Sequence, residues 1–146
     1  MGLFKRKKDK DRGVYAILCN SSILTSNQIK EALESELNKE CNFVDFYITQ
    51  FPWDAEDQLN KMPYDFLFID EVTETSKDIE RILTRIRNEN EDIKIVLFST
   101  YISDLTLRLS KTKTIDTYVL MPFQPSHVIH AVSECIKTQD EESIEI

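Results

Sequence analysis

The sequence predicts an α/β domain built on a doubly wound sheet of five parallel strands in the order 2-1-3-4-5. Three observations lead to this prediction. Five short apolar runs recur along the chain, each bounded by polar residues. Segments in which apolar residues follow a helical spacing separate these runs. A chain of 146 residues, 41% of them hydrophobic, is long enough to bury one such core without disulfides or a structural metal.

The first strand is expected at residues 15–19, because this run is apolar throughout, as in a strand that is buried on both faces. The other strands are expected at residues 43–48, 66–69, 93–98 and 118–121. Parallel neighbours need helical crossovers, and right-handed crossovers place helices on both faces of the sheet.

The first helix is predicted over residues 26–38, where Ile29, Leu33 and Leu37 recur every four residues. Asp54 is the expected N-cap of the second helix. The later helices are predicted at residues 54–62, 79–86, 102–109 and 125–137. The chain therefore divides into an N-terminal arm over residues 1–12, one domain over residues 13–137 and an acidic tail over residues 138–146.

Charge is unevenly distributed between the arm and the domain. Residues 1–12 hold six basic and two acidic residues, a net charge of +4, so the remaining residues carry −12 of the chain's total of −8. A domain this acidic repels phosphates, which argues against nucleic-acid binding. The arm joins Leu3 and Phe4 to a basic cluster, so one interpretation is a weak contact with anionic membranes, at about 1 kcal/mol per basic residue. The alternative, which we favour, is a flexible, solvated arm.

The cysteines and histidines indicate no metal site and no cofactor. Three cysteines without CxxC spacing are typical of a reducing compartment, and no signal peptide or membrane-spanning run is present, so a cytoplasmic location is expected. His127 and His130 are three residues apart, but the spacing suggests no further ligands.

Ligands of doubly wound sheets bind at the carboxyl ends of the strands. The candidate site residues at these positions are Asn20, Ser21, Asp70, Ser99, Thr100 and Met121.

Three of these strands, taken in order, resemble response-regulator receiver domains across residues 13–137. The motifs are YDFLFID, which ends at Asp70, IVLFST, which contains Ser99, and DTYVLMPF, which contains Tyr118. The resemblance implies a flavodoxin-like fold and a role in signal transduction by two-component systems. It also implies that Asp70 is at the phosphoacceptor position, Ser99 at the switch hydroxyl and Tyr118 at the switch aromatic.

The sequence departs from this family where phosphorylation depends on charge. Receivers hold Mg²⁺ with an acidic pair after the first strand, and the matching positions are Asn20 and Ser21. The family's lysine falls at Met121, whose thioether carries no charge. Phosphoryl transfer rests on such electrostatic contacts, and losing one can cost about 3–4 kcal/mol. The loop 71–75 lacks the family's Pro-Gly pattern and adds acidic residues. The sequence therefore predicts a degenerate pseudo-receiver.

The expected function is that of a stand-alone, non-enzymatic adaptor that binds another protein, of unidentified kind, or a second copy of itself. By analogy with receivers, the expected interface comprises the fourth helix, fifth strand and fifth helix. Its candidate contact residues are Leu105, Arg108, Lys111 and Tyr118. Trp53 is either a further exposed anchor or a staple that packs its loop onto the domain.

Two alternative functions remain open at this point. One is a single-domain regulator phosphorylated on Asp70, with a metal site rebuilt from ligands such as Glu71. The other is a regulator recruited to membranes by the basic arm. For Asp70 itself, the simpler interpretation is that its carboxylate accepts backbone N–H bonds and caps the loop.

Overall fold

The computed structural model describes residues 13–71 and 76–144, in which strands and helices alternate. The strands are β1 (Gly13–Cys19), β2 (Asn42–Thr49), β3 (Phe66–Asp70), β4 (Lys94–Ser99) and β5 (Thr117–Leu120). The helices are α1 (Ile23–Glu34), α2 (Pro52–Lys61), α3 (Ser76–Glu89), α4 (Asp104–Lys111) and α5 (Pro125–Ile144). The predicted basic arm and most of the acidic loop after Asp70 lie outside the described residues.

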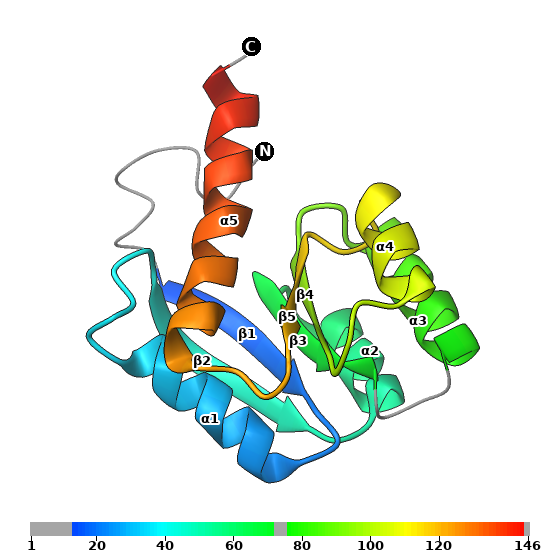
Figure 1. Ribbon diagram of the computed structural model, residues 1–146, viewed down its shortest axis with the longest axis horizontal. Helices are drawn as coiled ribbons and strands as arrows, with labels where there is room; N and C mark the ends of the chain where they lie inside the picture. Colours follow the sequence, from blue (N-terminus) through cyan, green and yellow to red (C-terminus); the bar gives the residue numbers. More distant parts are fainter. Residues whose placement is uncertain (1–12, 72–75, 145–146) are drawn as a thin grey trace.

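The strands form one parallel sheet in the order β2-β1-β3-β4-β5, which confirms the predicted topology (Figure 1). All five residues of β3, at the centre, are buried. A strand that is covered on both faces needs apolar side chains in both directions, and this explains the continuous apolar runs in the sequence.

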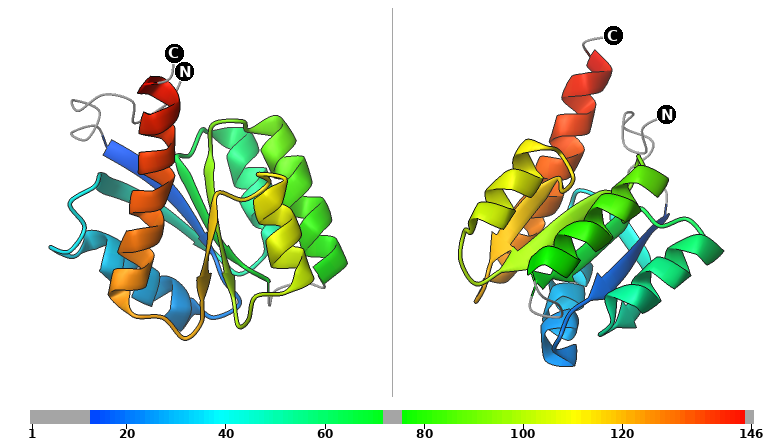
Figure 2. Two further views of the ribbon diagram at one scale, coloured as in Figure 1. Left: turned by 45° about the horizontal axis from the view of Figure 1, so that its top comes forward. Right: turned by 90° about the vertical axis from the view of Figure 1, so that its right-hand side faces the viewer.

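Helices cover both faces of the sheet, as Figures 1 and 2 show. On one face, α1 and α5 pack against side chains such as Val14, Leu18 and Val96. On the other face, α2, α3 and α4 pack against side chains such as Ile17 and Leu67. The three cysteines are buried within these two layers and form no disulfide.

A group of phenylalanines fills the layer under α1 and α5. The ring of Phe68, which is fully buried, lies 5.5 Å from that of Phe66 and 6.3 Å from those of Phe43 and Phe98. Aromatic rings at such separations add specific packing to the area that they bury. Phe68 thus links strands β2, β3 and β4 through one cluster.

Helix α1 begins and ends earlier than predicted. The Ser22 hydroxyl accepts a hydrogen bond from the backbone of Thr25 and caps the helix, which therefore begins at Ile23, three residues upstream of the predicted start. After the helix, the Asn38 amide donates to the carbonyl of Leu33, one of the acceptors that a helix end leaves without a partner. Leu37 consequently lies outside the helix and is 60% exposed, so its periodicity with Ile29 and Leu33 was misleading.

The predicted N-cap of α2 was also wrong. Pro52 takes the first position of the helix, where its missing N–H costs nothing, and Phe51 is therefore the N-cap. Asp54 lies in the first turn instead, where its carboxylate accepts a hydrogen bond from the Tyr47 hydroxyl at 3.0 Å.

The three later helices differ from their predicted bounds, and α3 extends beyond the predicted residues 79–86 at both ends. A capping box formed by Ser103 and Thr106 starts α4, so Ile102 precedes the helix. Helix α5 continues to Ile144, whereas the sequence analysis ended the domain at residue 137 and assigned residues 138–146 to a tail. The apolar periodicity ends at Ile136, but polar residues that favour helix continue the backbone beyond it. No helix among the described residues is long and apolar enough to cross a membrane.

We predict that Phe68→Ala lowers the free energy of unfolding by about 3–5 kcal/mol, because it leaves a cavity among rings that cannot close over it. Urea unfolding followed by circular dichroism measures the loss. Leu107→Ala, on the exposed side of α4, is the control and should change stability by no more than about 0.5 kcal/mol. Equal losses in the two variants would contradict the packing described here.

Candidate functional site

The candidate site lies where β1, β3 and β4 end at one edge of the sheet (Figure 1). Asp70 is the last residue of β3 and is 1% exposed. Ser99 ends the neighbouring strand β4, and Asn20 follows β1 on the other side; both are fully buried. The topology therefore brings together these polar side chains, as the sequence predicted from the ends of the strands.

Two hydrogen bonds from Ser21 engage the Asp70 carboxylate. The backbone N–H of Ser21 donates to Asp70 Oδ2 at 3.0 Å, and the Ser21 hydroxyl donates to the same oxygen at 3.1 Å. Hydrogen bonds to an ionised acceptor are stronger than neutral ones, so this contact ties the loop after β1 to the end of β3. The Asp70 carboxylate thus accepts a backbone N–H and caps the loop after β1, as the simpler interpretation of this residue predicts.

Asn20 is held by the neighbouring elements. Its backbone N–H donates to the carbonyl of Thr49 at 3.2 Å, and its side-chain Nδ2 donates to Ser26 Oγ at 3.3 Å. The other side-chain atom, Oδ1, is buried and accepts no hydrogen bond from the protein. The Gln50 amide donates to the carbonyl of Ser21 at 3.0 Å, so the loops that follow β1 and β2 support each other.

Glu71 adds a second carboxylate next to Asp70. It is half-buried, and its Oε2 atom accepts no hydrogen bond from the protein. Burial raises the pKa of Glu71 above its ordinary value of 4.5; the Ser99 hydroxyl opposes this shift, and the charge of Asp70 adds to it. The sequence analysis named Glu71 only as an alternative metal ligand, because its burial beside Asp70 depends on the fold.

Met121 and Thr100 take no part in a charged site. The backbone N–H of Met121 donates to the carbonyl of Ser99 at 2.8 Å, and its side chain packs against the core under α1 and α5. Thr100 is exposed. The position that the resemblance assigns to the family's lysine thus carries an apolar side chain that packs with other apolar groups.

The residues present are a poor match for the divalent cation that the resemblance implies. Mg²⁺ favours anionic oxygen ligands in octahedral geometry. After β1 the chain offers an amide and a hydroxyl, and the hydroxyl of Ser21 already donates to Asp70. In residues 13–71 and 76–144, no three His, Cys, Asp or Glu side chains gather as a metal site would require.

The predicted interface residues differ in their exposure. Leu105 is 5% exposed and packs in the core under α4, so it was wrong to expect it on the surface. Residues 105 and 109 of the helix face the sheet, and this turns Leu107, which is 55% exposed, to the solvent. The Arg108 guanidinium forms two 2.8 Å hydrogen bonds with the Glu80 carboxylate of α3. Lys111 is exposed and Tyr118 is half-buried.

Trp53 lies on the outside of α2. Its ring is 66% exposed and stacks on that of Phe51, with 5.9 Å between the ring centres. This exposed position does not fit the staple, because a staple would be covered by the domain, and the role of anchor stays a prediction. Phe51, which is 53% exposed, was not singled out from the sequence.

Comparisons with known proteins identify the fold. No family model and no curated protein matches the sequence. A response regulator from Thermotoga maritima is 25% identical, with a TM-score of 0.68 over 86% of this chain and 98% of that chain. A two-component transcriptional regulator from Clostridium phytofermentans is 19% identical, with a TM-score of 0.68 over 91% and 99%. An orphan response regulator of H. pylori is 14% identical, with a TM-score of 0.67 over 84% and 96%. The chain has the fold of response-regulator receiver domains.

We predict that Glu71→Gln alters how stability depends on pH. The folded protein holds the Glu71 proton more tightly than the unfolded chain does, so the free energy of unfolding falls as pH rises above 4.5 toward the raised pKa. Glutamine cannot ionise, so this part of the decline should be missing in the variant. Urea unfolding across a pH series measures the difference, with Glu34→Gln on the exposed face of α1 as control. Parallel profiles for wild type and Glu71→Gln would contradict the assignment.

Proposed function

We propose that this protein is a pseudo-receiver that acts as an adaptor and binds another protein without being phosphorylated. One observation carries the proposal: the carboxylate at the phosphoacceptor position accepts both hydrogen bonds that Ser21 donates, at 3.0 and 3.1 Å. Ser21 occupies one of the positions where receivers place acidic residues. In this chain it therefore stabilises Asp70 directly, where an acidic residue would hold a cation.

The charge balance of the site supports the same conclusion. A phosphoryl donor brings negative charge to Asp70, which already has Glu71 beside it. Transfer requires cationic groups that stabilise the transferring oxygens. The side chain at the position of the family's lysine, Met121, packs into the apolar core instead. Attack of Asp70 on a phosphoryl donor would thus proceed without the contacts that lower its barrier.

The surface of α4 and β5 offers features that a protein partner can use. Leu107 on α4 and Leu120 at the end of β5 are 55% and 41% exposed, and Lys111 lies exposed at the end of α4. Apolar anchors surrounded by polar groups are typical of protein interfaces. The Arg108 guanidinium pairs with the Glu80 carboxylate and links α4 to α3 beside this surface. The partner is another protein or a second copy of this chain.

The proposal includes a non-enzymatic role in the cytoplasm. Its support is the chemistry of the cysteines: three thiols that are all buried and unpaired suit a reducing compartment.

The test is incubation of the full chain with acetyl phosphate and Mg²⁺, followed by intact mass measurement. We expect no mass increase in the wild type, because the contacts that phosphoryl transfer needs are replaced by neutral groups. Asp70→Asn, which lacks the acceptor, gives the background. A gain of one phosphoryl group in the wild type that is absent from Asp70→Asn would refute the proposal.

A second candidate function is a regulator that is phosphorylated on Asp70 with a rebuilt metal site. Two observations favour it: Glu71 Oε2 and Asn20 Oδ1 are buried oxygens that accept no hydrogen bond from the protein. Oxygen atoms of this kind are the ligands that hard cations prefer. In the same mass experiment, this function predicts phosphorylation of the wild type and its loss in Glu71→Gln.

We further predict that Leu107→Asp weakens adaptor binding. A charge in place of an interface anchor should lower affinity about thirtyfold or more, the effect of losing about 2 kcal/mol or more. Quantitative affinity capture from the native cell measures the retained partners. Leu24→Asp, at another exposed leucine, on α1, is the matched control. Asp70→Asn should retain the same partners as the wild type, and loss of binding in that variant would link the interaction to phosphorylation.

A further inference from the structure

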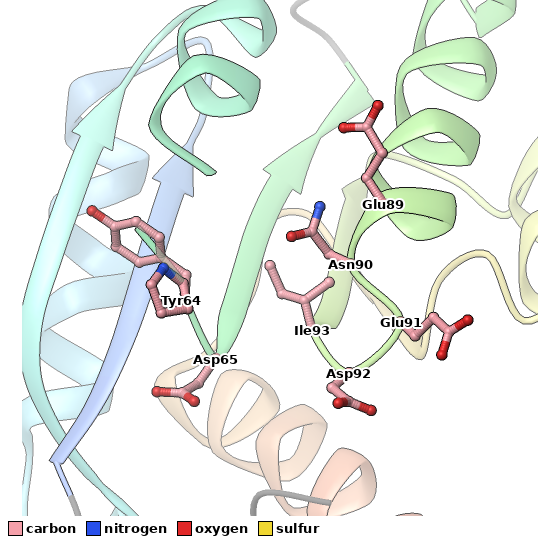
Figure 3. A pocket seen from close by; sticks show the side chains of 8 residues that line it. Tyr64, Asp65, Glu89, Asn90, Glu91, Asp92 and Ile93 are labelled. Atoms are coloured by element: carbon pink, nitrogen blue, oxygen red, sulfur yellow. The ribbon is translucent and has the colours of Figure 1, made fainter. Parts of the chain in front are cut away.

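A groove lies at the opposite end of the sheet from Asp70, between the start of β3 and the loop that joins α3 to β4 (Figure 3). Its volume is about 410 Å³. Tyr64 and Ile93, both buried, form an apolar floor, whereas its rim is acidic. The exposed rim carboxylates belong to Glu89, Glu91 and Asp92, and the buried Asp65 also lines the groove.

The groove is built into the fold and needs no ligand to shape it. Arg87 Nη1 donates to the carbonyls of Glu91 at 3.0 Å and of Ile93 at 2.7 Å, and this fixes the loop that forms one wall. On the opposite wall, the carbonyl of Asp65 accepts a hydrogen bond from the backbone of Lys94 at 2.9 Å. Both walls are therefore held in place by the sheet and by α3.

The basic arm is attached beside this groove. The backbone N–H of Tyr15 in β1 donates to Asp65 Oδ2 at 2.8 Å, so the start of β1 lies next to the acidic rim. Residues 1–12, which carry a net charge of +4, precede β1 directly. Neighbouring strands lie about 4.8 Å apart, and eight extended residues span roughly 26 Å. The basic residues from Arg12 back to Lys5 are thus within reach of the groove.

We propose that residues 1–12 dock into this groove of their own chain. The aliphatic stems of lysine and arginine cover the apolar floor while their charged ends meet the rim carboxylates. Three properties match: the sign of the charge, the amphipathic nature of the side chains and the length of the tether. The proposal is independent of the receiver interpretation, because it involves neither Asp70 nor the surface of α4.

The test measures how fast trypsin releases the arm from the full chain, with intact mass as the readout. We expect about tenfold faster release in E89Q/E91Q/D92N, because three ion pairs, each of modest strength, are lost together. E31Q/E34Q/E36Q, on α1 and in the turn that follows it, changes the net charge equally and should release the arm at the wild-type rate. Added salt should accelerate release from the wild type and leave the groove variant unchanged.

The same trypsin experiment distinguishes docking into the groove from other contacts of the arm. D140N/E141Q/E142Q removes the competing acidic residues of α5, and faster release in that variant alone would overturn the proposal. Equal rates in the groove and α1 variants would do the same. If dilution of the protein removed the protection of the arm from trypsin, the arm would bind the groove of a second copy of the chain, which would also contradict the proposal.

A second measurement covers the case in which the groove variant does not fold. In K8Q/K10Q/R12Q the groove itself is untouched, and the backbone amide resonances of Glu91 and Asp92 should shift relative to wild type. The exposed-lysine control K39Q/K77Q/K111Q should leave these resonances in place. Unshifted resonances in the arm variant would refute the docking.

Discussion

The two hydrogen bonds that Ser21 donates to Asp70 are the contact around which this molecule is organised. They join the end of β3, the central strand of the sheet, to the loop after its neighbour β1. A charge-assisted contact of this kind satisfies a carboxylate that is otherwise expensive to bury. In a receiver, the carboxylate at this position accepts a phosphoryl group. Here Ser21 satisfies one oxygen of the buried carboxylate from within the chain, and the function that we propose uses the outer surface.

Much of the fold could be predicted because strand burial leaves a strong signal. Continuous apolar runs such as that of β3 occur when a strand is covered on both faces, so strand number, type and order followed from the sequence. The helix ends were harder to predict, since Ser22 and Pro52 set them through local hydrogen bonding and steric fit. Leu37 matches the four-residue spacing of Ile29 and Leu33 by chance. It lies outside α1 because the helix ends before it.

The candidate site was predictable in position but not in its contacts. Parallel topology brings the carboxyl ends of the strands together, so Asn20 and Asp70 were placed correctly from the sequence. Side-chain pairing depends on distances of a few tenths of an ångström, and no periodicity encodes that Ser21 donates twice to one oxygen. The exposure of Leu107 rather than Leu105 likewise depends on how α4 rotates against the sheet.

Burial of the three thiols makes their reactivity a measure of local opening in the folded protein. Burial raises the pKa of Cys41 to about 12 and also raises the pKa of Cys135, so neither is a thiolate at neutral pH. Because thiolates are the reactive form, alkylating reagents can modify these side chains only through transient opening. Cys19 belongs to one layer, Cys41 and Cys135 to the other. Site-resolved alkylation rates would therefore compare the fluctuations of the two faces of one sheet.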